Sequence, residues 1–214
     1  MQFHDFFRCL EAKAPQTRVE VELLRELINL HHTGVGSVKI RYFPDFDGAQ
    51  LGNFIWLDED RTSPHEEPYN DALIFVNSKF APDRAMRRIV AAKELMHVFD
   101  APGQRASDPA LVRKLIQEIN SKPLSEDSSE PYKADRFALW KATIALVPPW
   151  IRDEFIDQWR AGTVKAHELV ARWWLPESVV SAAMGAYYPI AMEKVMKPVT
   201  KVVIEAPEND PNLG

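Results

Sequence analysis

The spacing of the apolar residues changes twice along this chain. Apolar residues recur every three to four positions over residues 2–12 and 18–31, which predicts two amphipathic helices. Apolar and polar residues then alternate over residues 38–42, and this period of two predicts a half-buried strand. Short apolar runs at residues 54–57 and 72–76 predict two further strands.

From about residue 82 the helical spacing returns and continues almost to the end of the chain. Residues 83–100 are apolar nearly all the way round, which is typical of a central, buried helix. The narrow polar sector of this helix holds Lys93, Glu94 and His97, and we expect it to face a cleft. Later helices are predicted over residues 132–146, 150–160, 164–173 and 176–193.

These patterns predict an α+β fold in a single domain over residues 1–205. We expect N-terminal helices over residues 1–34, followed by a small, mostly antiparallel sheet over residues 35–78. A helical part over residues 83–194 is expected to pack against that sheet. Residues 206–214 are rich in Pro, Asn and Asp, which predicts a disordered tail.

The composition and charge narrow the class of protein. The chain has 214 residues, of which 46% are hydrophobic and 27% charged, as in soluble globular proteins. Its net charge of -5 argues against direct binding to nucleic acid or to an anionic membrane. Cys9 is the only cysteine, so no internal disulfide can form. There is no signal-peptide pattern and no apolar run of about 20 residues, so we expect a cytoplasmic protein.

The most informative polar residues lie in the sequence Lys93-Glu94-Leu95-Met96-His97. In an HExxH helix, two histidines four residues apart bind zinc, and the glutamate beside the first one polarises the metal-bound water. Glu94 and His97 stand where this motif would place them, but Lys93 occupies the first histidine position. A lysine ammonium group has no lone pair, so it repels a dication instead of binding it.

Further short motifs follow in order along the chain. The sequence Ile74-Phe75-Val76-Asn77 precedes the KELMH helix, and Ala134-Asp135-Arg136-Phe137-Ala138 follows it. Over about residues 35–190, this order resembles the ImmA/IrrE family of zinc metallopeptidases. The resemblance implies a zincin-like helical bundle, hydrolase activity with zinc as cofactor, and a link to prophages or stress regulation. Peptidases of that family cleave helix-turn-helix repressors.

The departures from the family pattern fall on its functional positions. Lys93 replaces the first zinc-binding histidine, and Lys133 stands where the resemblance implies an acidic third ligand. Glu94 carries over as the catalytic base of an active enzyme, and His97 carries over as a metal ligand. A catalytic zinc normally needs three protein ligands. The carboxylates that could complete a rearranged site with His97 are those of Asp100, Glu130 and Asp135.

A structural role for Lys93 would explain its substitution. A buried, unpaired carboxylate is costly, whereas a paired one is tolerated. We hypothesise that the ammonium group of Lys93 replaces the metal as counter-ion to Glu94, and to a nearby carboxylate such as that of Asp135. Replacing Lys93 with Met should then destabilise the fold.

Three functions remain open on the sequence alone. The leading one is a pseudoenzyme without a metal cofactor that binds a protein partner, such as a helix-turn-helix repressor, and regulates it without cleavage. The second is an active zinc metallopeptidase in which His97 and rearranged carboxylates hold the metal. The third is a structural or interaction subunit encoded by a phage.

Two other groups of side chains bear on binding. An exposed aromatic surface for a partner is most plausible at Trp173 and Trp174, although tryptophans at helical spacing are usually part of a core. Arg84, Arg87 and Arg88 form a local basic run together with Lys93, and we interpret this run as a solvated face in preference to a phosphate site.

Overall fold

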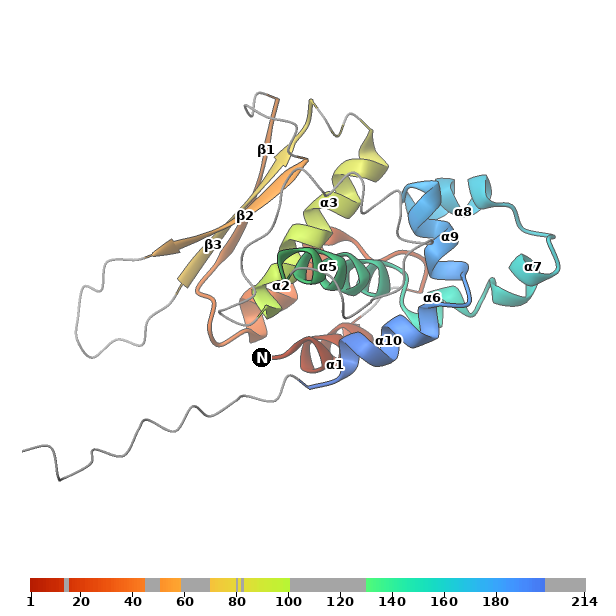
Figure 1. Ribbon diagram of the computed structural model, residues 1–214, viewed down its shortest axis with the longest axis horizontal. Coiled ribbons are helices and arrows are strands. Elements are labelled where there is room, and N and C mark those ends of the chain that lie inside the picture. Colours follow the sequence, from red (N-terminus) through yellow and green to blue (C-terminus); the bar gives the residue numbers. More distant parts are fainter. Residues whose placement is uncertain are drawn as a thin grey trace, which may run out of the picture.

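The computed structural model describes residues 1–13, 16–44, 51–58, 70–79, 81, 83–100 and 130–198. Within these ranges, a small sheet lies on one side of a group of helices (Figure 1). The predicted α+β class is therefore confirmed. The predicted tail over residues 206–214 lies outside the described residues. In the described ranges, every helix is too short or too polar to span a bilayer.

Two N-terminal helices form as the apolar spacing predicts: α1 (Phe3–Lys13) and α2 (Val21–His31). The buried face of α1 carries several phenylalanines. The rings of Phe3 and Phe6 lie 5.7 and 5.2 Å from the ring of Phe99, measured between centroids. Aromatic pairs at this separation add to the stabilisation from apolar burial, so α1 is held against the end of the central helix.

The sheet has three strands, β1 (Val38–Phe43), β2 (Gly52–Asp58) and β3 (Asn70–Asn77), in the order β1-β3-β2. β2 pairs with β3 in antiparallel fashion, whereas β1 runs parallel to β3. The expectation of a mostly antiparallel sheet was therefore wrong, because the sheet is mixed. Alternating side chains have the same period in both kinds of pairing, so the sequence pattern could not distinguish them.

The central helix, α3 (Arg84–Met96), begins at Asp83, whose side chain accepts a hydrogen bond from the Met86 backbone N–H at 2.7 Å. Such a cap stabilises a helix start by about 1 kcal/mol. The predicted helix over residues 83–100 is shorter than expected, since the chain tightens into a 3-10 turn, η1 (His97–Phe99). The C-terminal half of α3 is buried, as its apolar character predicts.

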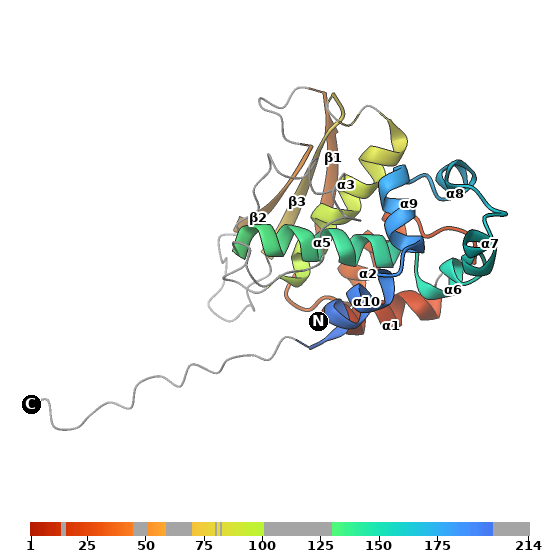
Figure 2. The same cartoon turned by 45° about the vertical axis from the view of Figure 1, so that its right-hand side comes forward.

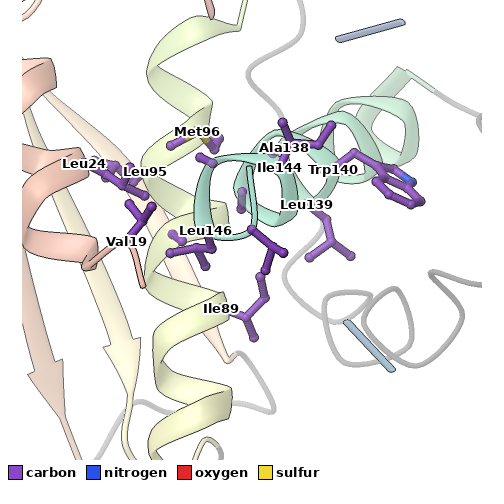
Figure 3. Close-up of a cluster of buried hydrophobic side chains, with 14 of the residues drawn as sticks. Val19, Leu24, Ile89, Leu95, Met96, Ala138, Leu139, Trp140, Ile144 and Leu146 are labelled. Atoms are coloured by element: carbon purple, nitrogen blue, oxygen red, sulfur yellow. The ribbon is translucent and has the colours of Figure 1, made fainter. Parts of the chain in front are cut away.

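A long helix, α5 (Glu130–Leu146), contacts α3, which in turn contacts β2 and β3. The three layers are therefore the sheet, α3 and α5 (Figures 1 and 2). Figure 3 shows the apolar core where α3 and α5 meet, close to the segment that leads into α2. Its labelled side chains include Leu24, Ile89, Leu95, Met96, Leu139, Trp140, Ile144 and Leu146, all of them buried.

The C-terminal part consists of short helices: α6 (Pro149–Arg152), α7 (Ile156–Arg160), α8 (Ala166–Trp173), α9 (Glu177–Met184) and α10 (Tyr188–Met196). The predicted helices over residues 150–160 and 176–193 are each divided in two. The second division falls at Gly185, whose ψ of 165° is extended and ends α9. The Tyr188 hydroxyl donates a hydrogen bond to the Val147 carbonyl at 2.7 Å, which ties α10 to the end of α5.

Candidate functional site

The candidate site is a cluster of buried charges between α3 and α5. On α3, Lys93 and Glu94 lie one turn before His97, so a single sector of the helix presents all three side chains. α5 contributes residues from the opposite side. The full set, all of it buried, is Lys93, Glu94, His97, Asp100, Asp135 and Lys141.

The ammonium group of Lys93 lies between two carboxylates. Its Nζ is 3.2 Å from Oε1 of Glu94 and forms a second ion pair with Oδ1 of Asp135. The side chains of Lys93 and Glu94 are each 1% exposed and that of Asp135 is 0% exposed. The pairing that we hypothesised from the sequence is therefore present.

The charges around Lys93 and Asp135 keep both side chains ionised at neutral pH. Burial alone would lower the pKa of Lys93, but the charges of Glu94 and Asp135 outweigh it and raise that pKa. Burial alone would raise the pKa of Asp135, yet His97 and Lys93 together lower it. Both shifts favour the charged forms, because each charge has a partner in a region of low dielectric constant.

His97 connects Asp135 to a second acidic residue. Its Nδ1 lies 2.5 Å from Oδ2 of Asp100, and its Nε2 lies 3.2 Å from Oδ1 of Asp135. Burial and Lys93 each lower the pKa of His97, but hydrogen bonding to Asp100 and Asp135 raises it above the usual value. The other oxygen of Asp100 accepts a hydrogen bond from Lys141 at 3.1 Å.

The formal charges of the cluster cancel when His97 is protonated. Two lysines and one imidazolium then face the carboxylates of Glu94, Asp100 and Asp135, giving +3 and -3. Isolated buried charges would be very costly, whereas a balanced and hydrogen-bonded set is tolerated. The six residues therefore form a charge-balanced network, in which Oε2 of Glu94 and Oδ2 of Asp135 have no hydrogen-bond partner among the described residues. We call these six residues the ion-pair network below.

The ammonium group of Lys93 lies among the carboxylates that could face a metal ion. It pairs with Oε1 of Glu94 and with Oδ1 of Asp135. Within the described ranges, no group of three or more His, Cys, Asp and Glu side chains is arranged to hold a metal ion. The expectation that the polar sector of α3 faces a cleft is wrong, because Lys93, Glu94 and His97 are all buried.

The other residues singled out in the sequence lie elsewhere. Lys133 is half-buried in the first turns of α5, two residues before Asp135, and the helix turns by about 200° over that interval. Glu130 begins α5, but its side chain lies outside the described part of the structure. Asp100 does join the network, although its place is beside His97 Nδ1 and Lys141.

The proposed aromatic surface is largely covered. Trp173 is 0% exposed and belongs to the core, so it presents no surface to a partner. Trp174 is half-buried, and the guanidinium groups of Arg18 and Arg84 lie 3.5 and 3.3 Å from the centroid of its ring. Cation–π contacts on the ring therefore hold Trp174 against the start of α3.

Two features of the site were not anticipated. Lys141 was missed, although it is a single charge within the apolar run of α5, which is a recognisable sign of a buried ion pair. Gly52, at the start of β2, is the second. A Cβ atom there would lie 2.6 Å from Val90 Cγ1 and 2.9 Å from Glu94 Cγ, so only glycine lets β2 approach α3 this closely.

Comparisons with known proteins place no relative beside this chain. No protein family, no curated protein and no solved structure matches it.

Proposed function

We propose that this chain is a metallopeptidase-like protein in which the ion-pair network takes the place of a metal site. In this proposal it acts as a non-catalytic regulator that binds a protein partner. The observation that carries the proposal is the position of Lys93. Its ammonium group pairs with both Glu94 and Asp135, and so supplies the positive charge that a metal ion would supply.

The surroundings of His97 support descent from a metal site. A metal-binding histidine usually donates its second ring N–H to a carboxylate or carbonyl, which fixes the ring and directs the other nitrogen to the metal. Here Asp100 holds Nδ1, and Nε2 points toward Asp135. This arrangement favours a scaffold derived from the zincin-like ImmA/IrrE bundle, with Asp100 in an orienting role.

The same contacts argue against hydrolysis. Glu94 would be the general base of an active enzyme, but its Oε1 is bound by Lys93 and its side chain is buried. A carboxylate held by an ammonium group is a weak base, and burial keeps substrate and water away from it. A zinc site built on His97 and Asp100 is disfavoured, since Asp100 already pairs with Lys141.

The partner class follows from the resemblance. Because peptidases of the ImmA/IrrE type act on helix-turn-helix repressors, we propose a repressor of this kind as the partner, in the cytoplasm and in a prophage or stress-response setting. A protein that retained the scaffold without the metal would control such a repressor by occupying it.

The test is to restore the metal site by a single substitution. Lys93→His would place a second imidazole beside His97 and Asp135, which together provide the three ligands of a catalytic zinc site. We expect no zinc in the wild-type protein after zinc reconstitution, and about one zinc per chain in Lys93→His, measured by elemental mass spectrometry. Adding Lys133→Glu should leave the zinc content of Lys93→His unchanged, because Lys133 is not part of the ion-pair network.

The matched control is Lys93→His combined with Asp135→Asn, which should lose the zinc again. Zinc binding that is insensitive to Asp135 would contradict the proposed site. Failure of a folded Lys93→His protein to bind zinc would contradict the proposed origin of the network. Stoichiometric metal in the wild type, lost in His97→Ala, would make this chain a metallopeptidase with rearranged ligands.

A further inference from the structure

A second candidate site lies at the opposite end of α3 from the ion-pair network. There, a cavity of about 500 Å³ opens between the start of α2, the strand β1 and the first turns of α3. Its lining residues are Glu20, Val21, Glu22, Ile40, Tyr42, Arg84, Arg87 and Arg88. We call this the arginine groove.

The arginine groove carries an excess of positive charge. Three guanidinium groups and two carboxylates line it, which leaves an excess of one positive charge in a chain whose net charge is -5. The carboxylates are already paired, Glu20 with Arg18 and Arg88, and Glu22 with Arg25. The interpretation of this basic run as a solvated face is therefore wrong for Arg88, which is buried and paired with Glu20.

Two of the lining arginines have no acidic partner in the described part of the chain. Arg87 is half-buried, and no carboxylate of the described residues lies within ion-pair distance of it. Arg84 contacts the Trp174 ring and likewise has no acidic partner among those residues. A half-buried guanidinium group is stabilised when a carboxylate binds it through two hydrogen bonds, so this groove is suited to an acidic ligand.

The adjoining edge of the sheet offers backbone hydrogen bonds. The carbonyl of Ser37, just before β1, accepts a hydrogen bond from Ala72, and that of Phe43 accepts one from Ser78, just after β3. The odd-numbered residues of β1 therefore face β3, and the even-numbered ones face outward. Both backbone groups of Val38 already have hydrogen-bond partners: its N–H donates to the Asn29 side chain, and its carbonyl accepts from the Arg25 guanidinium group. The outward backbone groups of Ile40 and Tyr42 have no hydrogen-bond partner among the described residues.

The unpaired edge and the arginines belong to the same groove, since Ile40 and Tyr42 line it together with Arg87. Tyr42 is 52% exposed, so a ligand can reach this end of β1. A small anion would satisfy the guanidinium groups but leave the strand edge unpaired. An extended peptide would satisfy both, because added strands pair with an exposed edge while their alternate side chains enter pockets.

We propose that the arginine groove binds an extended, acidic segment of a partner protein, which adds to the sheet beside β1 and directs its carboxylates to Arg84 and Arg87. This inference rests on the proposed function in one respect, namely that the chain has a protein partner. The two are tested separately, because zinc binding by Lys93→His does not involve the groove and peptide binding does not involve the network.

The probe is a short, fluorescein-labelled peptide of alternating valine and glutamate, and binding is followed by fluorescence anisotropy on the full chain. We expect saturable binding that weakens as salt is added, because exposed charges are screened. Arg87→Ala should weaken binding about tenfold, as expected for the loss of one charge-assisted contact. Arg41→Ala is the matched control and should change the affinity less than about twofold, because the exposed Arg41 is not part of the groove lining.

Strand addition has its own test. A peptide with the same sequence but N-methyl groups on alternate amides cannot pair with β1, and we expect it not to bind. Tyr42→Pro removes an outward N–H together with the side chain, so it should abolish binding. Tyr42→Val loses the same side chain but keeps that N–H, so it should weaken binding less than Tyr42→Pro does. Circular dichroism of each variant establishes that it is folded.

Several results would overturn the proposal. Equal binding of the N-methylated peptide, or of a valine–lysine peptide, would exclude an acidic strand as the ligand. Binding of pyrophosphate but not of the peptide, lost in Arg87→Ala, would make the groove a small-anion site. Concentration-dependent dimerisation of the wild type that is lost in Tyr42→Pro would identify a second copy of the chain as the occupant.

Discussion

At the scale of single residues, Lys93 decides the chemistry of the candidate site. A histidine at this position would present a lone pair to a metal, whereas lysine presents a positive charge to Glu94 and Asp135. Lys93 is therefore a counter-ion to these two carboxylates and cannot act as a metal ligand at neutral pH. Buried ion pairs contribute little net stability, but the removal of one partner is costly because it leaves the other charge unpaired.

We therefore expect Lys93→Met to destabilise the protein by about 3 kcal/mol, as found for broken buried ion pairs. In Lys93→Met combined with Asp135→Asn, the loss should be smaller than the sum of the two single losses, because the asparagine carries no charge. Urea unfolding of the four proteins gives the coupling energy.

Lys39 provides the control, since it is exposed on β1, and Lys39→Met should change the free energy of unfolding by no more than about 0.5 kcal/mol. A Lys93→Met protein as stable as the wild type would show that the ammonium group is not needed as a counter-ion.

At the scale of elements, the contact of β2 with α3 depends on Gly52. The strand begins directly over Val90 and Glu94, at a distance that leaves no room for a Cβ atom. Because Glu94 belongs to the ion-pair network, the sheet and the network share this contact. The position of β2 therefore helps to keep Glu94 beside Lys93.

We expect Gly52→Ala to destabilise the protein by about 1–3 kcal/mol, the usual cost of forcing an extra carbon into a packed core. Val90→Ala in the same chain should recover part of this loss, because it removes the Cγ1 atom that lies 2.6 Å from the added carbon. Thermal unfolding of both proteins measures the effect.

Gly34→Ala is the matched control. The atom nearest to its added Cβ would be His32 Cε1 at 3.5 Å, which is an ordinary contact, so the melting temperature should hardly change. If Gly52→Ala were as stable as Gly34→Ala, the close packing of β2 on α3 would be disproved.

At the scale of the whole molecule, the ion-pair network makes stability depend on pH. The pKa of His97 is raised above 6.5 by Asp100 and Asp135, against the opposing effects of burial and Lys93. Its stabilising contribution is complete below pH 6.5 and is lost as the pH rises through the folded-state pKa. The pKa of Asp135 is lowered below 3.8, so its contribution is present above that pH and is lost in acid.

The contribution of His32 to stability depends on pH in the opposite direction from that of His97. Burial and the nearby N-terminal charge lower the pKa of His32 to about 4, so its contribution is present above pH 6.5 and falls as the pH drops toward 4. This residue is therefore neutral at pH 7. An imidazolium interaction of His32 with the end of α2, which its position next to this helix end would favour, is therefore absent at that pH.

Of the two histidines, only His97 should therefore change the free energy of unfolding substantially between about pH 6.5 and pH 8. We expect wild-type stability in urea to decrease over this range, and the decrease to be smaller in His97→Gln. The imidazole signals of His97, followed by NMR, should titrate above pH 6.5. Titration of His97 below pH 6.5 would contradict the described network.

The sequence alone predicted much of the architecture. Apolar periodicity located the helices α1 and α2, the three strands and the buried helix α3, because burial of one face leaves a regular trace in the chain. The spacing of Lys93, Glu94 and His97 placed them together, since residues three and four apart share a helical face. The pairing of Lys93 with Glu94 and Asp135 followed from the cost of an unpaired buried charge.

Only the tertiary structure decided how these elements meet. The sheet order and the parallel pairing of β1 with β3 leave no trace in a period of two. Residues two apart point to nearly opposite sides of a helix, so Asp135 and Lys133 cannot both face the network. The orientation of α5 against α3 decided that Asp135 does. Long-range packing set these choices: it buried the network, placed Trp173 in the core, and left the edge of β1 open beside the arginines.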